Sequence, residues 1–146
     1  MTAPLKQRLQ SDLDQARRAR DKARTVLLST TLSEIRNREI DAGREADDDL
    51  VIEVLTRALK QRRDAADQMR SGGREELAEK EEAEAEVLNT YLPAGLDADE
   101  VRAMIAAIRA DGVEAMGAVM GRLMPEIRGR FDGREANRLV REALEG

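Results

Sequence analysis

Residues 46–73 read ADDDLVIEVLTRALKQRRDAADQMRSGG, and this stretch decides the fold class. Three aspartates open it, where acidic side chains favour a helix N-terminus, and two glycines end it. Between them apolar residues recur every three or four positions, which is the spacing of one helix face. They are Leu50, Val51, Val54, Leu55, Ala58, Leu59, Ala65, Ala66 and Met69. The stretch therefore predicts one amphipathic helix of roughly six turns.

The same spacing recurs through the rest of the chain. Charged residues make up 38% of the sequence and aromatic residues 1%, and long segments consist of Ala, Leu, Glu and Arg. This composition favours helices and lacks the residues that strands need, so no large β-sheet is expected. Further helices are predicted over residues 4–22, 26–42, 75–92, 101–110, 114–124 and 134–144.

Pro93-Ala94-Gly95 marks a domain boundary, because proline and glycine both interrupt a helix. Asp97 and Glu100 follow with the spacing of a capping-box variant, which starts a new helix. The sequence thus predicts an all-α protein in two parts. Residues 1–93 form a hairpin or bundle of about four helices, and residues 94–146 form a small three-helix domain.

Cysteine and histidine are both absent. The chain therefore has no disulfide, no thiolate metal ligand, no cysteine nucleophile and no imidazole base. The acidic run from Glu79 to Glu86 is typical of a solvated helix face, whereas a cation site needs oxygens that converge from a shaped loop. We expect no catalytic residue, no bound metal and no cofactor.

The chain contains no apolar run typical of a signal peptide or of a membrane-spanning helix. On this basis we expect a cytoplasmic protein without a membrane partner. The net charge of −5 also argues against general coating of nucleic acid, which depends on Lys and Arg neutralising phosphates. The net charge does not exclude a basic face on one part of the surface.

The segment 121–141 is such a local exception, with six arginines against three acidic residues. At 100° per residue, Arg134, Arg138 and Arg141 fall within a narrow wedge of the last helix. This stripe could hold phosphates by bidentate contacts, or it could pair with Glu142 and Glu145.

Gly117 and Gly121 form a Gly-x-x-x-Gly pair in the preceding helix. In a soluble helix this spacing indicates a smooth groove that another backbone can approach. Two alternatives are open, namely internal packing and a surface for a partner or RNA. Because each mid-helix glycine costs roughly 1 kcal/mol against alanine, we expect the groove to be used.

Five segments together resemble the GatB/YqeY family, specifically the free-standing YqeY-like proteins. The resemblance covers essentially the whole chain. One difference is Phe131, where the family usually has alanine in the turn before the last helix. The segments are Asn37-Arg38-Glu39-Ile40, Lys60-Gln61-Arg62-Arg63-Asp64, Lys80 through Pro93, Met116 through Gly121, and Gly129 through Asn137.

The resemblance implies a C-terminal domain similar to the tail of the GatB subunit of tRNA-dependent amidotransferase, where the tail helps engage tRNA. By that analogy the positions nearest RNA are Gly117, Gly121, Arg130, Gly133, Arg134 and Asn137. The arginine-rich segment adds Arg122, Arg128, Arg138 and Arg141 to the expected RNA-binding set.

The resemblance also carries a family label of carbon–nitrogen ligase activity with glutamine as amide donor. The residues do not support this as a stand-alone activity, because we find neither a glutaminase nucleophile nor a nucleotide- and metal-binding site. The hypothesis is a non-catalytic tRNA-associated protein of translation. On this hypothesis it is auxiliary to an amidotransferase, and its protein partner is an amidotransferase subunit or an aminoacyl-tRNA synthetase. The alternative is a helical protein–protein adaptor.

Overall fold

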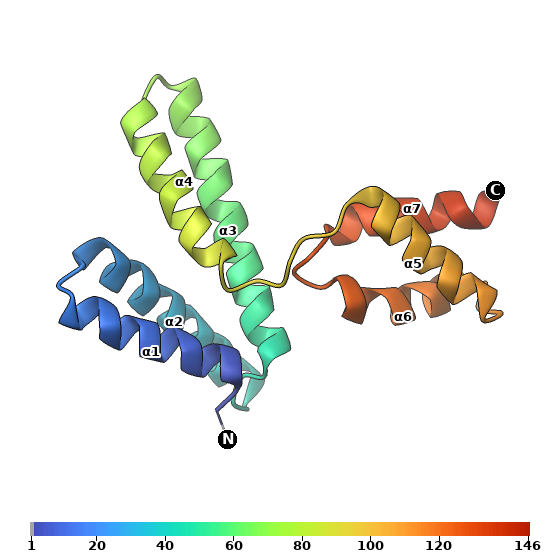
Figure 1. Cartoon of the computed structure of the whole chain (residues 1–146), viewed down its shortest axis with the longest axis horizontal. Helices are drawn as coiled ribbons and strands as arrows, with labels where there is room; N and C mark the ends of the chain where they lie inside the picture. The colour runs from blue at the N-terminus through green and yellow to red at the C-terminus, as the bar shows by residue number, and fades with distance from the viewer. Residues whose placement is uncertain (1) are drawn as a thin grey trace. The chain divides into compact units, whose positions relative to one another are not determined.

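The computed structural model describes residues 2–146, and every regular element in this range is an α-helix. The all-α prediction is thereby confirmed (Figure 1). The chain divides into two compact units, Met1–Leu92 (unit 1) and Pro93–Gly146 (unit 2). The helices are α1 (Pro4–Arg18), α2 (Lys22–Ala42), α3 (Asp48–Ser71), α4 (Glu75–Asn89), α5 (Ala98–Ala110), α6 (Met116–Ile127) and α7 (Gly133–Glu145).

Aspartate side chains cap α3, α5 and α7 in the same way as Asp21 caps α2. The side chains of Asp47, Asp97 and Asp132 accept the backbone N–H three residues on, at 2.9, 2.7 and 3.2 Å respectively. Each bond satisfies one of the donors that a helix N-terminus leaves free. These caps therefore fix where α3, α5 and α7 begin.

The first helix is shorter than predicted. It ends at Arg18, because Arg20 adopts the left-handed conformation with φ 57° and Asp21 then caps α2 by accepting the Arg24 N–H at 3.1 Å. A left-handed non-glycine residue gives no signal in the apolar spacing, which continues across the turn. Residues 4–22 are thus one helix and the start of another.

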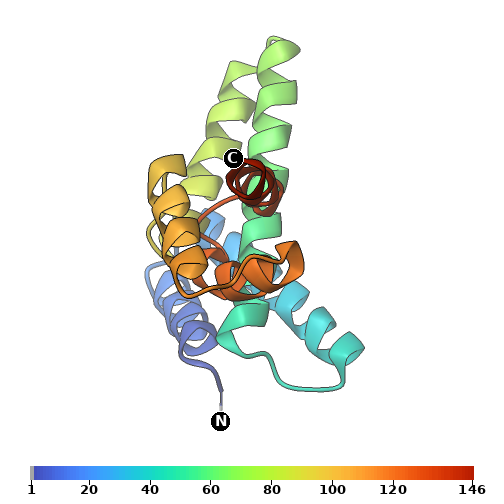
Figure 2. The same cartoon turned by 90° about the vertical axis from the view of Figure 1, so that its right-hand side faces the viewer.

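Unit 1 consists of two antiparallel helix pairs, α1 with α2 and α3 with α4. Figures 1 and 2 both show α3 and α4 side by side. The pairs join where α1 and α2 pack on α3. The shared core is aliphatic apart from Tyr91, and its fully buried members include Leu9, Leu28, Ile35, Val51, Leu55 and Leu88.

The carboxylate of Glu39 joins three segments of unit 1. It pairs with the Lys6 ammonium of α1 at 2.8 Å and accepts the backbone N–H of Ala46 at 2.7 Å, just before α3. These two bonds, Lys6 first, hold the pKa of Glu39 below its usual value. A further bond from the Leu5 N–H to Asp48 Oδ1, at 3.1 Å, fastens the start of α1 to the start of α3.

Unit 2 packs α5, α6 and α7 against one another around Val101, Ile105, Val119, Leu123 and Leu139. Phe131 packs against this core. Its larger side chain thus gains a place in the apolar interior of the unit.

The segment that opens unit 2 is held by Arg130. Its backbone carbonyl accepts the Leu96 N–H at 2.8 Å, and its guanidinium donates to Ala94 O at 2.9 Å and to Glu126 O at 3.2 Å.

Among the helices of the described range, none is both long enough and apolar enough to cross a membrane.

Tyr91 ties the end of α4 to α1, and its titration tests this contact. Its hydroxyl donates to the Asp12 carboxylate, and the Arg8 guanidinium lies 4.6 Å from the ring centroid. Burial, and then Asp12, raise the pKa of Tyr91 to about 12.

We predict that the single tyrosine of the folded protein ionises near pH 12 rather than near the usual ~10. Because the pKa of Tyr91 is raised in the folded protein, this contact contributes fully to the free energy of unfolding below about pH 10. The contribution is lost as the pH rises through the pKa of the folded state. Ultraviolet absorbance of the phenolate measures the midpoint, with circular dichroism as a check on folding and the urea-denatured chain as control. An equal midpoint in both states would contradict the contact.

Candidate nucleic-acid interface and a polar cleft

Arg134, Arg138 and Arg141 all lie exposed on α7, but they differ in their partners. Arg138 forms ion pairs with Glu135 and Glu142. Arg141 donates from Nε to Asn137 Oδ1 at 3.1 Å. Within residues 2–146, Arg134 alone of the three makes no hydrogen bond or ion pair, so its guanidinium is available to a ligand.

The alternative of internal pairing therefore holds for one residue of the stripe. The guanidinium of Arg138 lowers the pKa of Glu135, so that carboxylate stays ionised at neutral pH. Its charge, together with that of Glu142, offsets the positive charge of Arg138. Within residues 2–146, Arg134, at the N-terminal end of α7, and Arg141 have no acidic partner, so their positive charges are not offset in this way.

Gly117 and Gly121 lie exposed on α6. A Cβ built at either position meets no heavy atom within 4 Å, apart from the helix's own nearby backbone. Internal packing in the described chain therefore does not explain the pair. Together with exposed Ala118 and Pro125 they form a side of α6 with little side-chain bulk, which we name the glycine face.

Pro125 gives the glycine face a polar group. Proline has no N–H, so the helical hydrogen bond that would join residue 125 to the carbonyl of Gly121 cannot form. With no side chain on Gly121 to cover it, this carbonyl can accept a hydrogen bond from outside the helix. Arg122 flanks the face, and its Nη1 forms an ion pair with Asp111 Oδ2 at 3.3 Å.

The other predicted RNA-binding positions have structural roles or lie elsewhere in unit 2. The guanidinium of Arg130 is engaged by backbone carbonyls, and a Cβ at Gly133 would lie 3.4 Å from the methyl group of Met124. Arg128 is partly buried at the end of α6. The structure thus gathers Gly117, Gly121 and Arg122 on α6, and Arg134, Asn137, Arg138 and Arg141 on α7.

The acidic side of α4 is not simply solvated. Glu84 pairs with Arg62 of α3 at 3.2 Å, and Glu75 and Glu82 both pair with Arg70. These bonds fasten α4 to α3 along its length. In the part of the chain that the structure describes, no three acidic residues are grouped so that they could hold a metal ion.

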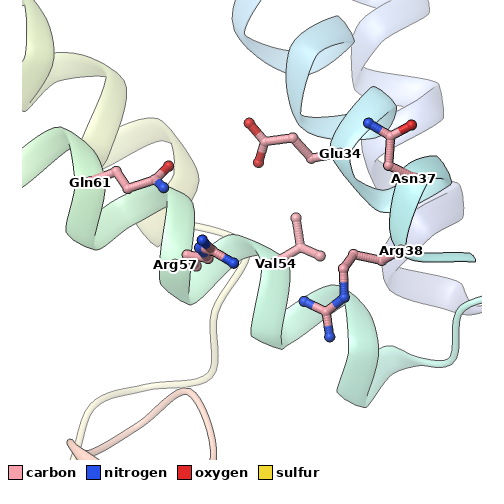
Figure 3. Close-up of a pocket in the computed structure, with 6 residues that line it drawn as sticks. All are labelled: Glu34, Asn37, Arg38, Val54, Arg57 and Gln61. Carbon is pink, nitrogen blue, oxygen red and sulfur yellow. The ribbon is translucent and has the colours of Figure 1, made fainter. Parts of the chain in front are cut away.

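A cleft of about 210 Å³ between α2 and α3 was missed by sequence reasoning (Figure 3). Glu34 from α2 and Gln61 from α3 point into it from opposite sides. It was missed because apolar spacing says nothing about which polar residues of two helices face each other. The only signal in the sequence was that two of the segments that resemble the family supply part of the lining. The lining residues are Glu34, Asn37, Arg38, Val54, Arg57 and Gln61.

The fold and these surfaces define a two-unit, all-helical protein whose exposed features are suited to binding. Residues 6–144 match the family model described as Yqey-like protein, and the chain belongs to that family. The identification suggested by the five segments is thereby confirmed.

Similar curated proteins carry the name "Altered inheritance of mitochondria protein 41, mitochondrial". The protein of Lachancea thermotolerans is 34% identical over 85 residues, which are 58% of this chain and 46% of that protein. That of Kluyveromyces lactis is 30% identical over 85% of this chain and 67% of its own length. That of Pyrenophora tritici-repentis is 27% identical over 94% and 79%. For Lachancea, the match spans about half the length of the relative.

These names correct the predicted location. They describe mitochondrial proteins, so the cytoplasmic assignment made from the sequence is wrong. It rested on missing signal-peptide and membrane-helix patterns, and those absences do not distinguish one aqueous compartment from another.

Substitution of Gly121 tests whether the glycine face is free of internal contacts. We predict that Gly121→Ala raises the free energy of unfolding by about 1 kcal/mol, because alanine favours a helix and the new methyl group meets open space. Urea unfolding followed by circular dichroism measures the change. Gly43→Ala is the control and should destabilise by about 1 kcal/mol, since Gly43 has φ 66°. A loss of stability in Gly121→Ala would show that the face is packed.

Proposed function

We propose that this protein is a non-catalytic binding protein for structured RNA of the tRNA class, and that unit 2 makes the contact. The observation that carries the proposal is the glycine face, which is exposed, free of internal contacts and flanked by Arg122. A surface without protruding side chains lets a nucleic-acid backbone come close to the helix. Arg134 supplies an unpaired cation in the same unit.

The polar group on the glycine face favours RNA over DNA. The Gly121 carbonyl is an acceptor, and the ribose 2′-hydroxyl is the donor that distinguishes RNA from DNA in a wide, shallow minor groove. The chain has one tyrosine, one phenylalanine and no tryptophan, so stacking on splayed bases contributes little. Recognition by shape and backbone follows from both features.

Any amide-transfer chemistry associated with this RNA belongs to a partner. The chain has no cysteine and no histidine, so it lacks the usual nucleophile and base of such reactions. We propose an auxiliary role in which the protein holds the RNA for an enzyme such as an amidotransferase or a synthetase.

Affinity for bulk tRNA should fall as the salt concentration rises, because phosphate contacts release counterions. Arg134→Ala should weaken binding and reduce the slope of log K against log salt by about 1, the share of one phosphate contact. Fluorescence anisotropy of labelled tRNA across a salt series measures both quantities. The control is Arg17→Ala, which removes an equal charge from α1, where Arg17 is 58% exposed.

A DNA duplex should bind more weakly than an RNA duplex of the same sequence, because it lacks the 2′-hydroxyl. Equal salt slopes for wild type, Arg134→Ala and Arg17→Ala would refute the assignment of RNA to unit 2. Absence of tRNA binding, with a protein partner retained after nuclease treatment, would instead establish the adaptor alternative.

A further inference from the structure

The α2–α3 cleft in unit 1 presents one carboxylate and one guanidinium that have no partner in the protein. Glu34 stands on the α2 wall and Arg57 on the α3 wall. Within residues 2–146 neither side chain forms a hydrogen bond or an ion pair. The amides of Asn37 and Gln61 are likewise unpaired there, and Val54, 4% exposed, supplies an apolar floor.

Elsewhere in unit 1, charges on neighbouring helices do form ion pairs. Arg38 and Glu53 pair at 2.9 Å between α2 and α3, and Arg62 and Glu84 pair at 3.2 Å between α3 and α4. Arg38 also lines the cleft, but its bond to Glu53 offsets its charge. The free charges of the lining are therefore one negative and one positive.

This charge pattern selects the chemical class of ligand. A phosphate or a simple carboxylate would be attracted by Arg57 and repelled by Glu34, and a simple cation would meet the opposite balance. A molecule that carries both charges satisfies both walls. Primary amides offer a donor and an acceptor each, so Asn37 and Gln61 can bind its remaining polar atoms.

The size of the cleft limits the ligand further. Its volume of about 210 Å³ lies below the roughly 300–1,000 Å³ of sites that take drug-sized ligands. A small molecule with a short hydrocarbon portion against Val54 fits this space.

We propose that the α2–α3 cleft binds a small zwitterion of the amino-acid class, with its carboxylate at Arg57 and its ammonium group at Glu34. The site lies in unit 1, whereas the RNA surface is proposed for unit 2. It assigns a ligand to a surface that the RNA-binding role does not use.

The test is a titration of the isotope-labelled full chain with each standard L-amino acid in turn, followed by two-dimensional ¹⁵N–¹H spectra. We expect at least one amino acid to cause saturable shifts of the side-chain amide signals of Asn37 and Gln61. Glu34→Gln and Arg57→Gln should each weaken that binding about tenfold, because each removes a charged hydrogen-bond partner. Lys60→Gln is the matched control on α3, where Lys60 is 76% exposed and outside the lining, and should leave affinity unchanged.

Blocking the ligand separates the two walls. N-acetylation of the amino acid removes its positive charge. The acetylated amino acid should therefore bind the wild type about as weakly as the unmodified amino acid binds Glu34→Gln. Acetylation should weaken binding to Glu34→Gln itself little further. Unchanged backbone spectra of the variants show that they fold. The proposal is overturned if no amino acid causes saturable shifts. It is also overturned if acetylation of the amino acid and both substitutions leave the affinity as it is for the wild type with the unmodified amino acid.

Discussion

The Glu39 carboxylate is the contact on which the arrangement of unit 1 depends. It holds Lys6 of α1 and the backbone of Ala46 to one end of α2, so the two helix pairs are joined at that end. Away from this junction α2 and α3 diverge (Figure 1). The divergence leaves Glu34 and Arg57 on facing walls without bringing them into contact. A polar cleft thus results from where the hairpins are fastened.

Unit 2 is built on a different constraint. Pro125 and Gly121 both weaken α6 as a helix, one by removing a hydrogen bond and the other by its conformational freedom. Contacts within the described chain do not explain Gly121, since the space around it is open, and Pro125 is exposed. A partner that approaches the backbone closely gives both residues a role, and the aliphatic core formed by α5, α6 and α7 provides the stability that tolerates them.

Helices and their starts could be predicted because they depend on local chemistry. The spacing from Leu50 to Met69 and the aspartate at position 97 were sufficient for α3 and for the start of α5. The pairing of Arg138 depends on rotamers within one helix, and the α2–α3 cleft depends on the crossing of two helices. Spacing along the chain shows that the stripe can pair with Glu142, but it does not show which arginine forms the pair or that the cleft exists. The arginine stripe was therefore identified, but its single unpaired member, Arg134, was not.

Hydrogen exchange of the full chain with and without bulk tRNA tests the central claim most directly, because it locates the contact in one unit. The account predicts slower exchange in α6, around residues 117–122, and at the start of α7 near Arg134. Exchange in α1 to α4 should be unchanged. Protection confined to unit 1, or no protection at tRNA concentrations that saturate binding, would contradict the account.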